Sequence, residues 1–364
     1  MKQPAWQGHG IINRYRHLLP LQASTPVVSL GEGSTPLVYS SWLSKSVGEG
    51  NEVYIKCEGL NPTGSFKDRG MTVAISEAVE RHVQIVICAS TGNTSAAAAA
   101  YAARAGLSCV VLLPHGQIAA GKLLQAFLCG AKIISLHGSF DDALNIIRQL
   151  SRDPIVEIVN SINPLRIEGQ KTAAFEVVDE LGEAPDFHFL PIGNAGNITA
   201  YWRGYREYFT SGKCGILPKM IGFQALGAAP LVLRHIVPNP DTVASAIRIG
   251  NPASWRSAAS ALKQSRGFVD TVTDTEILSA QVQLARKEGI FVEPASAASI
   301  AGLLKCVALC PERSIIQKVQ EGARIVCTVT GHGLKDPNTP VGTDMCPIES
   351  DATVDSVRNI LEIG

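Results

Sequence analysis

The segment Gly59-Leu60-Asn61-Pro62-Thr63-Gly64-Ser65-Phe66-Lys67-Asp68-Arg69-Gly70 places a lysine where a loop becomes a helix. The Asn-Pro pair and the glycine after it predict the loop, Ser65 is the expected N-cap, and apolar residues from Met71 to Val79 continue the helix. A positive charge is disfavoured at a helix N-terminus, because the helix dipole is positive there. The pKa of Lys67 is therefore expected to be lowered.

A lysine of lowered pKa that is partly removed from water is the type that forms Schiff bases with carbonyl compounds. The alternative is a surface lysine paired with Asp68 or Glu58, which would have no chemical role. This segment alone leaves both interpretations open, and the remaining motifs distinguish them.

The composition favours an enzyme that acts on small molecules. The chain has 364 residues, enough for two domains, and a formal net charge of zero, which gives no reason to expect nucleic acid or an anionic membrane as partner. No stretch is apolar enough to span a bilayer, and no signal-peptide pattern opens the chain. The nine cysteines include no C-x-x-C pair and are expected to be reduced thiols of a cytoplasmic protein. No residues have metal-ligand spacing, so no metal is expected.

Short apolar runs alternate with helical patterns along most of the chain. Strands are expected at 53–57, 85–89, 109–113, 132–136, 155–159, 187–192, 220–224 and 324–330, and helices at 95–105, 119–129, 141–150, 169–181, 198–209, 274–288 and 297–309. Residues 1–30 are expected to pack on the body as an arm, and residues 228–257 to be irregular. Continuous apolar strands are typical of parallel sheets buried on both faces. We therefore expect an α/β protein with two doubly wound domains, whose ligands bind beyond the carboxyl ends of the strands.

Three of these strands end in polar loops. The first, Ala89-Ser90-Thr91-Gly92-Asn93-Thr94-Ser95, enters a helix and offers hydroxyl, amide and N–H groups to an anion. The second, Pro191-Ile192-Gly193-Asn194-Ala195-Gly196-Asn197, can curl around a phosphate, although a tight turn without a ligand is the alternative. No Gly-Lys-Ser/Thr follows it, so a single phosphate fits better than a nucleotide.

The third loop follows Thr330, whose hydroxyl can bond a neutral ring nitrogen. His332 stands alone between glycines, and we expect it to have a structural role. A Schiff-base lysine, a phosphate-binding loop and a hydroxyl for a ring nitrogen together meet the requirements of pyridoxal phosphate. Neither G-x-S-x-G nor H-E-x-x-H occurs, so a serine nucleophile and metal-dependent hydrolysis have no local support.

Beyond these loops, the sequence resembles a known family from about residue 30 to residue 340. The matching segments are Gly31–Leu37, Asn61–Gly70, Ser90–Thr94, Asn163–Thr172, Gly193–Asn197, Ile247–Pro252, Glu293–Ala298 and Thr330–Pro337. They resemble the threonine synthases of the tryptophan-synthase-β-like (fold type II) pyridoxal phosphate enzymes. The lysine loop and a turn of the form Ser/Thr-Gly-Asn are shared with threonine dehydratases and cysteine synthases. The segment around Arg166 and the Thr-Gly-His-Gly-Leu-Lys-Asp end favour threonine synthase.

The resemblance implies that O-phospho-L-homoserine and water become L-threonine and phosphate, the last step of threonine biosynthesis. Lys67 would hold the cofactor and move protons, Asn93 would bond the ring hydroxyl oxygen, and Thr330 would face the pyridine nitrogen. The cofactor phosphate would be bound by Gly193, Asn194, Ala195, Gly196 and Asn197. The substrate phosphate would lie nearest to Ser90, Thr94, Asn160, Ser161 and Arg166, with Arg166 as a bidentate clamp.

The resemblance also implies a division of the chain. Residues 1–66 and 159–364 would form a large cofactor-binding domain, and residues 67–158 a smaller, mobile one, with the cofactor in the cleft between them. A homodimer is expected. A threonine or serine dehydratase is the alternative enzyme, and a non-catalytic ligand-binding or regulatory protein on the same fold is the alternative of another class. The latter would have no need for Lys67.

Overall fold

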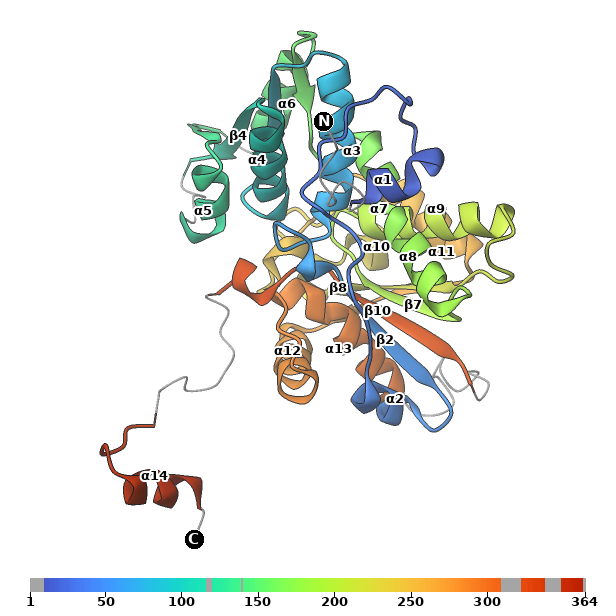
Figure 1. Cartoon of the computed structure of the whole chain (residues 1–364), viewed down its shortest axis with the longest axis vertical. Helices are drawn as coiled ribbons and strands as arrows, with labels where there is room; N and C mark the ends of the chain where they lie inside the picture. The colour runs from blue at the N-terminus through green and yellow to red at the C-terminus, as the bar shows by residue number, and fades with distance from the viewer. Residues whose placement is uncertain (1–9, 116–119, 139, 309–321, 338–347, 363–364) are drawn as a thin grey trace, which may run out of the picture.

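The computed structural model describes residues 10–115, 120–138, 140–308, 322–337 and 348–362. Two β-sheets form the body, and helices cover both faces of each sheet (Figure 1). The described cysteines are not disulfide-bonded. The C-terminal helix α14 (Val354–Leu361) lies apart from the body and has no buried residue (Figure 1).

The larger sheet has the strand order β1-β2-β10-β7-β8-β9. Only β1 runs antiparallel to its neighbour, and the other pairs are parallel. The strands are β1 (Leu37–Tyr39), β2 (Glu52–Cys57), β10 (Arg324–Val329), β7 (Phe187–Pro191), β8 (Lys219–Ala225) and β9 (Phe268–Val272). Because β2 and β10 are parallel neighbours, the lysine loop after β2 and the loop after β10 meet at the same edge of the sheet.

The smaller sheet has the order β5-β4-β3-β6, and all its strand pairs are parallel. Its strands are β5 (Lys132–Leu136), β4 (Ser108–Pro114), β3 (Ile85–Ala89) and β6 (Val156–Ile158). Parallel strands place their carboxyl ends together, so the Ser90–Ser95 turn after β3 and the segment after β6 lie at one edge. Both expected parallel sheets are thus confirmed.

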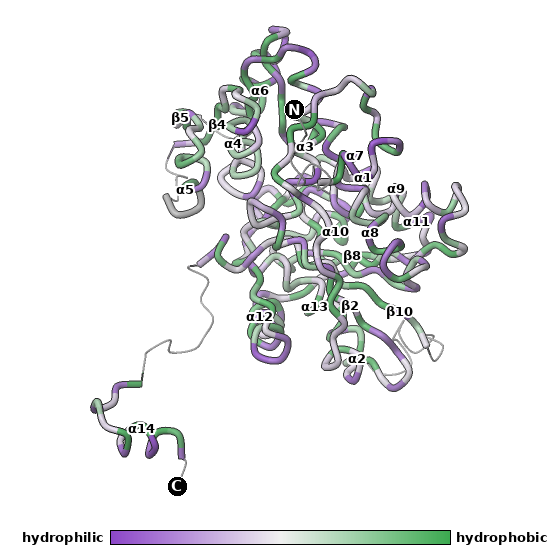
Figure 2. The backbone as a smooth tube through the Cα atoms, viewed as in Figure 1, coloured by the Kyte–Doolittle hydropathy of each residue, from purple (hydrophilic) through white to green (hydrophobic). Residues whose placement is uncertain are grey.

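Helices cover the sheets because alternate strand residues face opposite sides. In β10, Ile325 and Cys327 pack in a core with α2, α12 and α13, whereas Val326 packs in a second core with α1, α8, α9 and α11. Figure 2, in which the backbone is coloured by residue hydropathy, shows hydrophobic residues along β2 and β10. The bounds of these helices are α1 Ile11–Tyr15, α2 Ser41–Val47, α8 Thr172–Leu181, α9 Gly196–Thr210, α11 Trp255–Gln264, α12 Asp274–Glu288 and α13 Pro294–Ala308.

The smaller sheet is covered in the same way. Val86 and Cys88 of β3 pack with helices α3, α4 and α5, and Ile87 packs with α6 on the opposite face. These helices are α3 Lys67–Glu80, α4 Asn93–Ala105, α5 Ala120–Leu128 and α6 Phe140–Leu150, and α7 (Pro164–Gln170) follows β6. Short helices are η2 Arg16–Leu18, η3 Glu58–Leu60, η4 Leu226–Ala228, α10 Pro230–Leu233, η5 Ser245–Ile247 and η7 Gly333–Lys335.

The N-terminal arm packs on the body from Gly10 onward, as expected. Ile11 and Ile12 are buried, and the Tyr15 hydroxyl donates to Asp179 Oδ2 at 2.7 Å. The expected irregular stretch 228–257 contains only short helices. The expected bounds of each strand and helix agree with the observed bounds to within three residues, where the residues are described. Residues 119 and 309, which were expected to be the first residue of one helix and the last of another, lie outside the described residues.

Some elements were not predicted from the sequence. The helix expected at 169–181 corresponds to α8, but α8 begins at Thr172, and residues 169–170 belong to a separate helix, α7, which meets α8 at Lys171. Helix α2, helix α11 and strand β9 were also not expected. Strand β9 is an edge strand whose Asp270 and Thr271 interrupt the apolar run, and most of its residues are only partly buried. The pattern of a fully buried strand is therefore absent there.

Candidate active site

The loop before Lys67 is fixed to the loop after β10 by backbone hydrogen bonds. Phe66 N donates to the Thr330 carbonyl oxygen at 3.0 Å, and His332 N donates to the Gly64 carbonyl oxygen at 2.9 Å. Gly64 has a φ of +84°, a left-handed conformation that favours glycine. These contacts place Lys67 beside Thr330 at the carboxyl end of the larger sheet.

Lys67 is the first residue of α3, and its Nζ lies 4.1 Å from the centroid of the Phe66 ring. Loss of hydration and the charge of Arg166 lower the pKa of Lys67 to about 7, while Glu293 acts in the opposite direction. The lowered pKa expected from the sequence is confirmed. Burial and a neighbouring cation, rather than the helix dipole alone, account for it.

Ser65 does not cap α3, so the N-cap expectation is wrong. The N-cap is Phe66, and no side chain caps the helix there. Ser65 is buried and forms an isolated backbone bridge with Gly331, which commits it to the pairing of the two loops. Its Oγ accepts a long hydrogen bond, at 3.4 Å, from Lys67 N.

Arg166 lies on α7, which crosses α3 closely. A Cβ added to Gly70 would lie 2.7 Å from the Arg166 carbonyl oxygen, and one added to Gly169 would lie 1.9 Å from the Arg69 carbonyl oxygen. Only glycine fits at these two positions of the crossing. Lys67 lies three residues before Gly70, and Arg166 lies three residues before Gly169. The close approach of the two helices therefore brings Arg166 near Lys67.

The Arg166 guanidinium is buried and largely unpaired. Its side chain is 1% exposed, and Nη1 donates to the Val159 carbonyl oxygen at 3.1 Å. Among the described residues, Nε and Nη2 have no hydrogen-bond partner. Burial lowers the pKa of Arg166 to about 10. Buried polar groups are normally paired, so these two N–H groups fit an anionic ligand.

The turn after β3 is held by hydrogen bonds within the turn and by Asn160, which follows β6. Ser90 Oγ accepts from Gly92 N at 3.2 Å, and Asn160 pairs with both backbone groups of Ala89, at 2.9 and 3.0 Å. Asn93 begins α4 and is buried, while Thr94, Ser161 and Ser90 remain partly exposed. The side chains of Ser90 and Asn160 therefore shape this turn, and they line the same sheet edge as Arg166.

The glycine loop Gly193–Asn197 forms the start of α9. Ala195 has a φ of 63°, and no side chain caps the helix, so its first N–H groups are open to a ligand. Asn194 Oδ1 accepts from Ala253 N at 3.2 Å, which braces the loop. Among the described residues, Asn197 Nδ2 is buried without a partner. This arrangement fits a bound phosphate group.

Two residues of the site were not predicted as site residues: Glu293 and Ser296, at the start of α13. Ser296 Oγ lies 3.0 Å from Thr330 Oγ1 and accepts from Gly331 N at 2.8 Å. Glu293 accepts from Asn93 Nδ2 at 3.1 Å on both carboxylate oxygens. Both residues lie in the segment Glu293–Ala298, which the sequence comparison had already matched to the family, but no role followed from that match.

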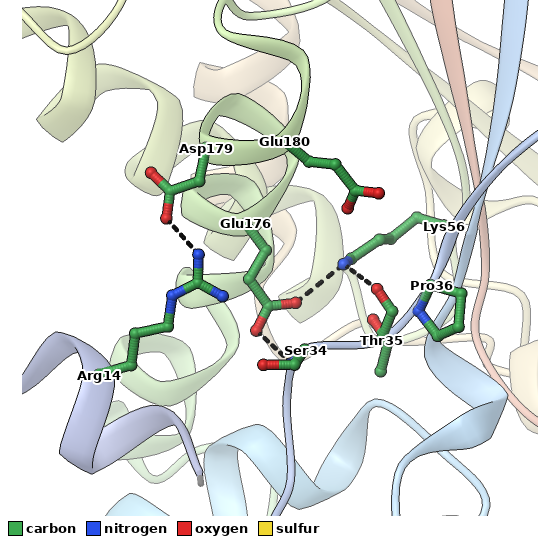
Figure 3. Close-up of a pocket in the computed structure, with 8 residues that line it drawn as sticks. All are labelled: Arg14, Ser34, Thr35, Pro36, Lys56, Glu176, Asp179 and Glu180. Atoms are coloured by element: carbon green, nitrogen blue, oxygen red, sulfur yellow. Dashed lines mark hydrogen bonds and ion pairs between the residues drawn. The ribbon is translucent and has the colours of Figure 1, made fainter. Parts of the chain in front are cut away.

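A buried ion cluster holds α3 against the larger sheet. Arg69 Nε lies 2.7 Å from a carboxylate oxygen of Glu58, and Arg69 Nη2 lies 2.6 Å from one of Glu176. Lys56 Nζ lies 2.8 Å from the same Glu176 carboxylate. Burial alone would raise the pKa of Glu176, but Arg69 and Lys56 hold it well below its ordinary value. Lys56 and Glu176 line a pocket beside the N-terminal arm, and Figure 3 shows them with its other lining residues. The volume of this pocket is about 330 Å³. Since Arg69 is two residues from Lys67, this cluster also fixes the start of α3.

No helix in the described part of the chain is long and apolar enough to cross a membrane. Within the same residues, no three or more His, Cys, Asp or Glu side chains gather as a metal site would require. His332 Nδ1 accepts from Leu334 N at 3.2 Å, which is the structural role expected for it.

Comparison with known proteins identifies the class. Residues 28–331 match the family described as "Pyridoxal-phosphate dependent enzyme", and the chain belongs to this family. Within it, the threonine synthase of Mycobacterium leprae (strain TN) is 55% identical over 356 residues, which cover 98% of this chain and 96% of that protein. The threonine synthase of Halalkalibacterium halodurans is 53% identical, with 93% and 92% covered. These similarities place the chain among the threonine synthases of the family.

Solved structures support the fold. Maize serine racemase matches with a TM-score of 0.68 at 22% identity, covering 90% of this chain and 92% of that one. Threonine deaminase isoform 2 from Solanum lycopersicum matches with a TM-score of 0.67 at 20% identity, covering 90% and 82%. At these identities the likeness concerns the fold alone.

Proposed function

We propose that this chain converts O-phospho-L-homoserine and water into L-threonine and phosphate. The observation that carries the proposal is the buried Arg166 guanidinium, which has two unpaired N–H groups and lies close enough to Lys67 to lower its pKa. A phosphorylated amino acid supplies what such a pair needs: an anion for the guanidinium and acidic C–H bonds for the amine.

The cofactor would be held by residues of both sheets. Lys67 would bond it covalently, Asn93 would donate to its ring hydroxyl oxygen, Gly193–Asn197 would bind its phosphate, and Thr330 would face the pyridine nitrogen. The unpaired Asn197 Nδ2 and the uncapped start of α9 support the phosphate site. Once bound, pyridoxal phosphate supplies an electron sink for charge at the carbon atoms of an attached amino acid.

The substrate phosphate would lie against Arg166, with Ser90, Thr94, Asn160 and Ser161 around it. Ser90 and Thr94 come from the turn after β3, and Asn160 and Ser161 come from the segment after β6. Because β3 and β6 are parallel neighbours, both segments lie at the same edge of the sheet. Arg166 offers a planar pair of N–H groups that can bond two phosphate oxygens together. This would fix the γ-carbon end of the substrate, where the phosphate leaves.

Lys67 would move the protons. Its amine, freed when the substrate binds, would take the proton from the α-carbon and give it up again before taking one from the β-carbon. Phosphate would then leave the γ-carbon, which would receive a proton, water would add at the β-carbon, and the α-carbon would regain its proton. An amine whose pKa is about 7 is divided between its acid and base forms at neutral pH, so it can do both. The charge of Arg166 would keep part of this amine neutral until phosphate binds.

The remaining expectations extend this proposal. Residues 1–66 and 159–364 would act as the large domain, and residues 67–158 would close over the substrate and keep out stray water. The division of the strands between two sheets supports these limits. We further propose that the enzyme is cytoplasmic and works as a homodimer.

The test is a product assay with purified protein loaded with pyridoxal phosphate. Phosphate and threonine should appear in equal amounts from O-phospho-L-homoserine, and Lys67→Ala should abolish both. The matched control is Arg14→Met, since Arg14 is 43% exposed and paired with Asp179. Cofactor binding without phosphate release, together with ammonia and 2-oxobutanoate from threonine, would instead indicate a dehydratase. A protein that binds the ligands and releases no product would refute any enzymatic role.

A further inference from the structure

Glu293 is a buried carboxylate to which the proposed reaction assigns no role. It is 3% exposed, and it accepts from Asn93 Nδ2 at 3.1 Å with both Oε1 and Oε2. Its backbone N donates to the Gly331 carbonyl oxygen at 3.1 Å. Glu293 thus joins the Asn93 turn of the smaller sheet to the loop after Thr330 in the larger one.

The charged groups around Glu293 come from two other segments. Lys67 of α3 and Lys335 lower its pKa, as does the hydrogen bond from Asn93, whereas Asp336 raises it. The nearby His332 is engaged with the Phe291 ring and with Leu334 N. Loss of hydration outweighs the lowering contributions and raises the pKa of Glu293 to about 7. Both its ionised and its protonated forms are therefore accessible near neutral pH.

The proton on Glu293 decides which end of the Asn93 amide can face it. A carboxylate only accepts hydrogen bonds, so it requires the Nδ2 end of the amide. A protonated carboxyl group can also donate, and it can then pair with Oδ1 after the amide has turned. The contact in the structure, with Nδ2 toward both oxygens, is the one that the ionised form requires.

We propose that Glu293 is a positioning residue, which orients the Asn93 amide toward the ring hydroxyl oxygen of pyridoxal phosphate. This rests on the proposed contact between Asn93 and the cofactor. With Glu293 ionised, Nδ2 gives one hydrogen to Glu293 and keeps the other for the ring oxygen. With Glu293 protonated, the amide turns, Oδ1 takes the place of that donor, and the ring oxygen loses its hydrogen bond.

Gly331 offers a way to displace Glu293 without removing it. A Cβ added to Gly331 would lie 2.3 Å from Glu293 Oε1, nearer than atoms can approach, so the carboxylate would have to shift. The φ of Gly331 is not in the left-handed region, so alanine is compatible with the backbone. Gly331→Ala should therefore reproduce the effect of removing the carboxylate.

The test measures the near-visible absorbance of full-length protein loaded with pyridoxal phosphate, without substrate, at pH values up to about two units on either side of 7. In the wild type, the balance between the absorbance bands should titrate as Glu293 gains and loses its proton. Glu293→Gln should abolish this titration, since glutamine pairs with either end of the amide and carries no proton equilibrium. Cofactor affinity should fall roughly tenfold, the worth of about one hydrogen bond.

Two further variants make the test specific. Asn93→Ala keeps the titratable carboxyl group of Glu293 but removes the amide, so it should also abolish the titration, whereas a direct effect of the carboxylate charge on the ring would persist. Glu49→Gln removes an exposed glutamate and should behave like the wild type. If Glu293→Gln does not fold, as judged by circular dichroism, Gly331→Ala decides.

A wild-type titration that persists in Glu293→Gln or in Gly331→Ala would overturn the inference while leaving the proposed function standing. A wild-type spectrum without titration over this range would overturn it as well. A protein that binds no pyridoxal phosphate at all would refute both the inference and the proposed function.

Discussion

Replacing Arg166 by methionine should stabilise the unliganded protein and at the same time inactivate it. Methionine is unbranched and follows the apolar stem of arginine, so it removes the charge with little loss of packing. Within the part of the chain that the structure describes, the Arg166 guanidinium is buried with one hydrogen bond, to Val159. A charge buried in this way opposes folding unless a ligand pairs with it.

The size of the effect follows from the lowered pKa of Arg166. A shift from 12.5 to about 10 corresponds to about 3 kcal/mol against the charged form in the folded state. Below pH 10 the residue is charged in both the folded and the unfolded chain, so the full cost is present at neutral pH. Losing the bond to Val159 offsets about 1 kcal/mol. The net gain should be about 1–2 kcal/mol, or a rise in Tm of about 1–4 °C.

The loss of activity should be much larger. Two charge-assisted hydrogen bonds to a phosphate, at about 1.5–3 kcal/mol each, imply that kcat/KM falls by at least about 100-fold. Thermal unfolding and phosphate release, measured on the same preparations, give both quantities. Arg14→Met, at an exposed and paired arginine, should change neither. The reasoning is refuted if Arg166→Met is less stable than the wild type and still releases phosphate at the normal rate.

Four other predictions concern Lys67 and the buried ion cluster. Borohydride should fix the cofactor to Lys67 in the wild type and should fix none in Lys67→Ala. Mass spectrometry of the peptide that contains position 67 measures this. The unliganded protein should capture pyridoxal phosphate faster as the pH rises to about 7 and then level off, because only the neutral Lys67 amine attacks the aldehyde; a rate that is independent of pH below 7 would contradict this. Glu176→Gln removes a partner of the buried Arg69 and should cost about 3–5 kcal/mol in urea unfolding, against at most about 1 kcal/mol for Glu52→Gln, whose partner Arg324 is exposed. Because the pKa of Glu176 is depressed in the folded state, its contribution should be present above its ordinary pKa of 4.5 and lost as the pH falls below it; a wild type and a Glu176→Gln variant with the same acid sensitivity would refute this.

The sequence predicted the fold well wherever the strands are buried on both faces. Strands β3, β4 and β8 were found because a continuous apolar run can only be accommodated between two layers of helices. Strand β9 escaped prediction because it lies at the sheet edge and carries Asp270. The pairing of β2 with β10 joins residues some 270 positions apart, and no local pattern encodes it.

The site residues that could be predicted are those whose role can be inferred from a short stretch of sequence. A lysine at a helix N-terminus and a glycine loop at a strand end can be identified from short segments, and both lie where the strands end. Glu293 could not be assigned in this way, since the role proposed for it depends on its contact with Asn93, 200 residues away in the sequence. The contact between α3 and α7 was also not predictable from a local pattern, because it depends on Gly70 of α3 and Gly169 of α7 lying against each other's helices.

The most direct test of the central claim uses water labelled with oxygen-18. The enzyme, loaded with pyridoxal phosphate, is supplied with O-phospho-L-homoserine in labelled water, and both products are analysed by mass spectrometry. If phosphate leaves from the γ-carbon and water adds at the β-carbon, threonine should carry one labelled oxygen in its side chain and the phosphate should carry none. Labelled phosphate together with homoserine would mean that water attacks phosphorus, and it would contradict the roles proposed for Lys67 and Arg166.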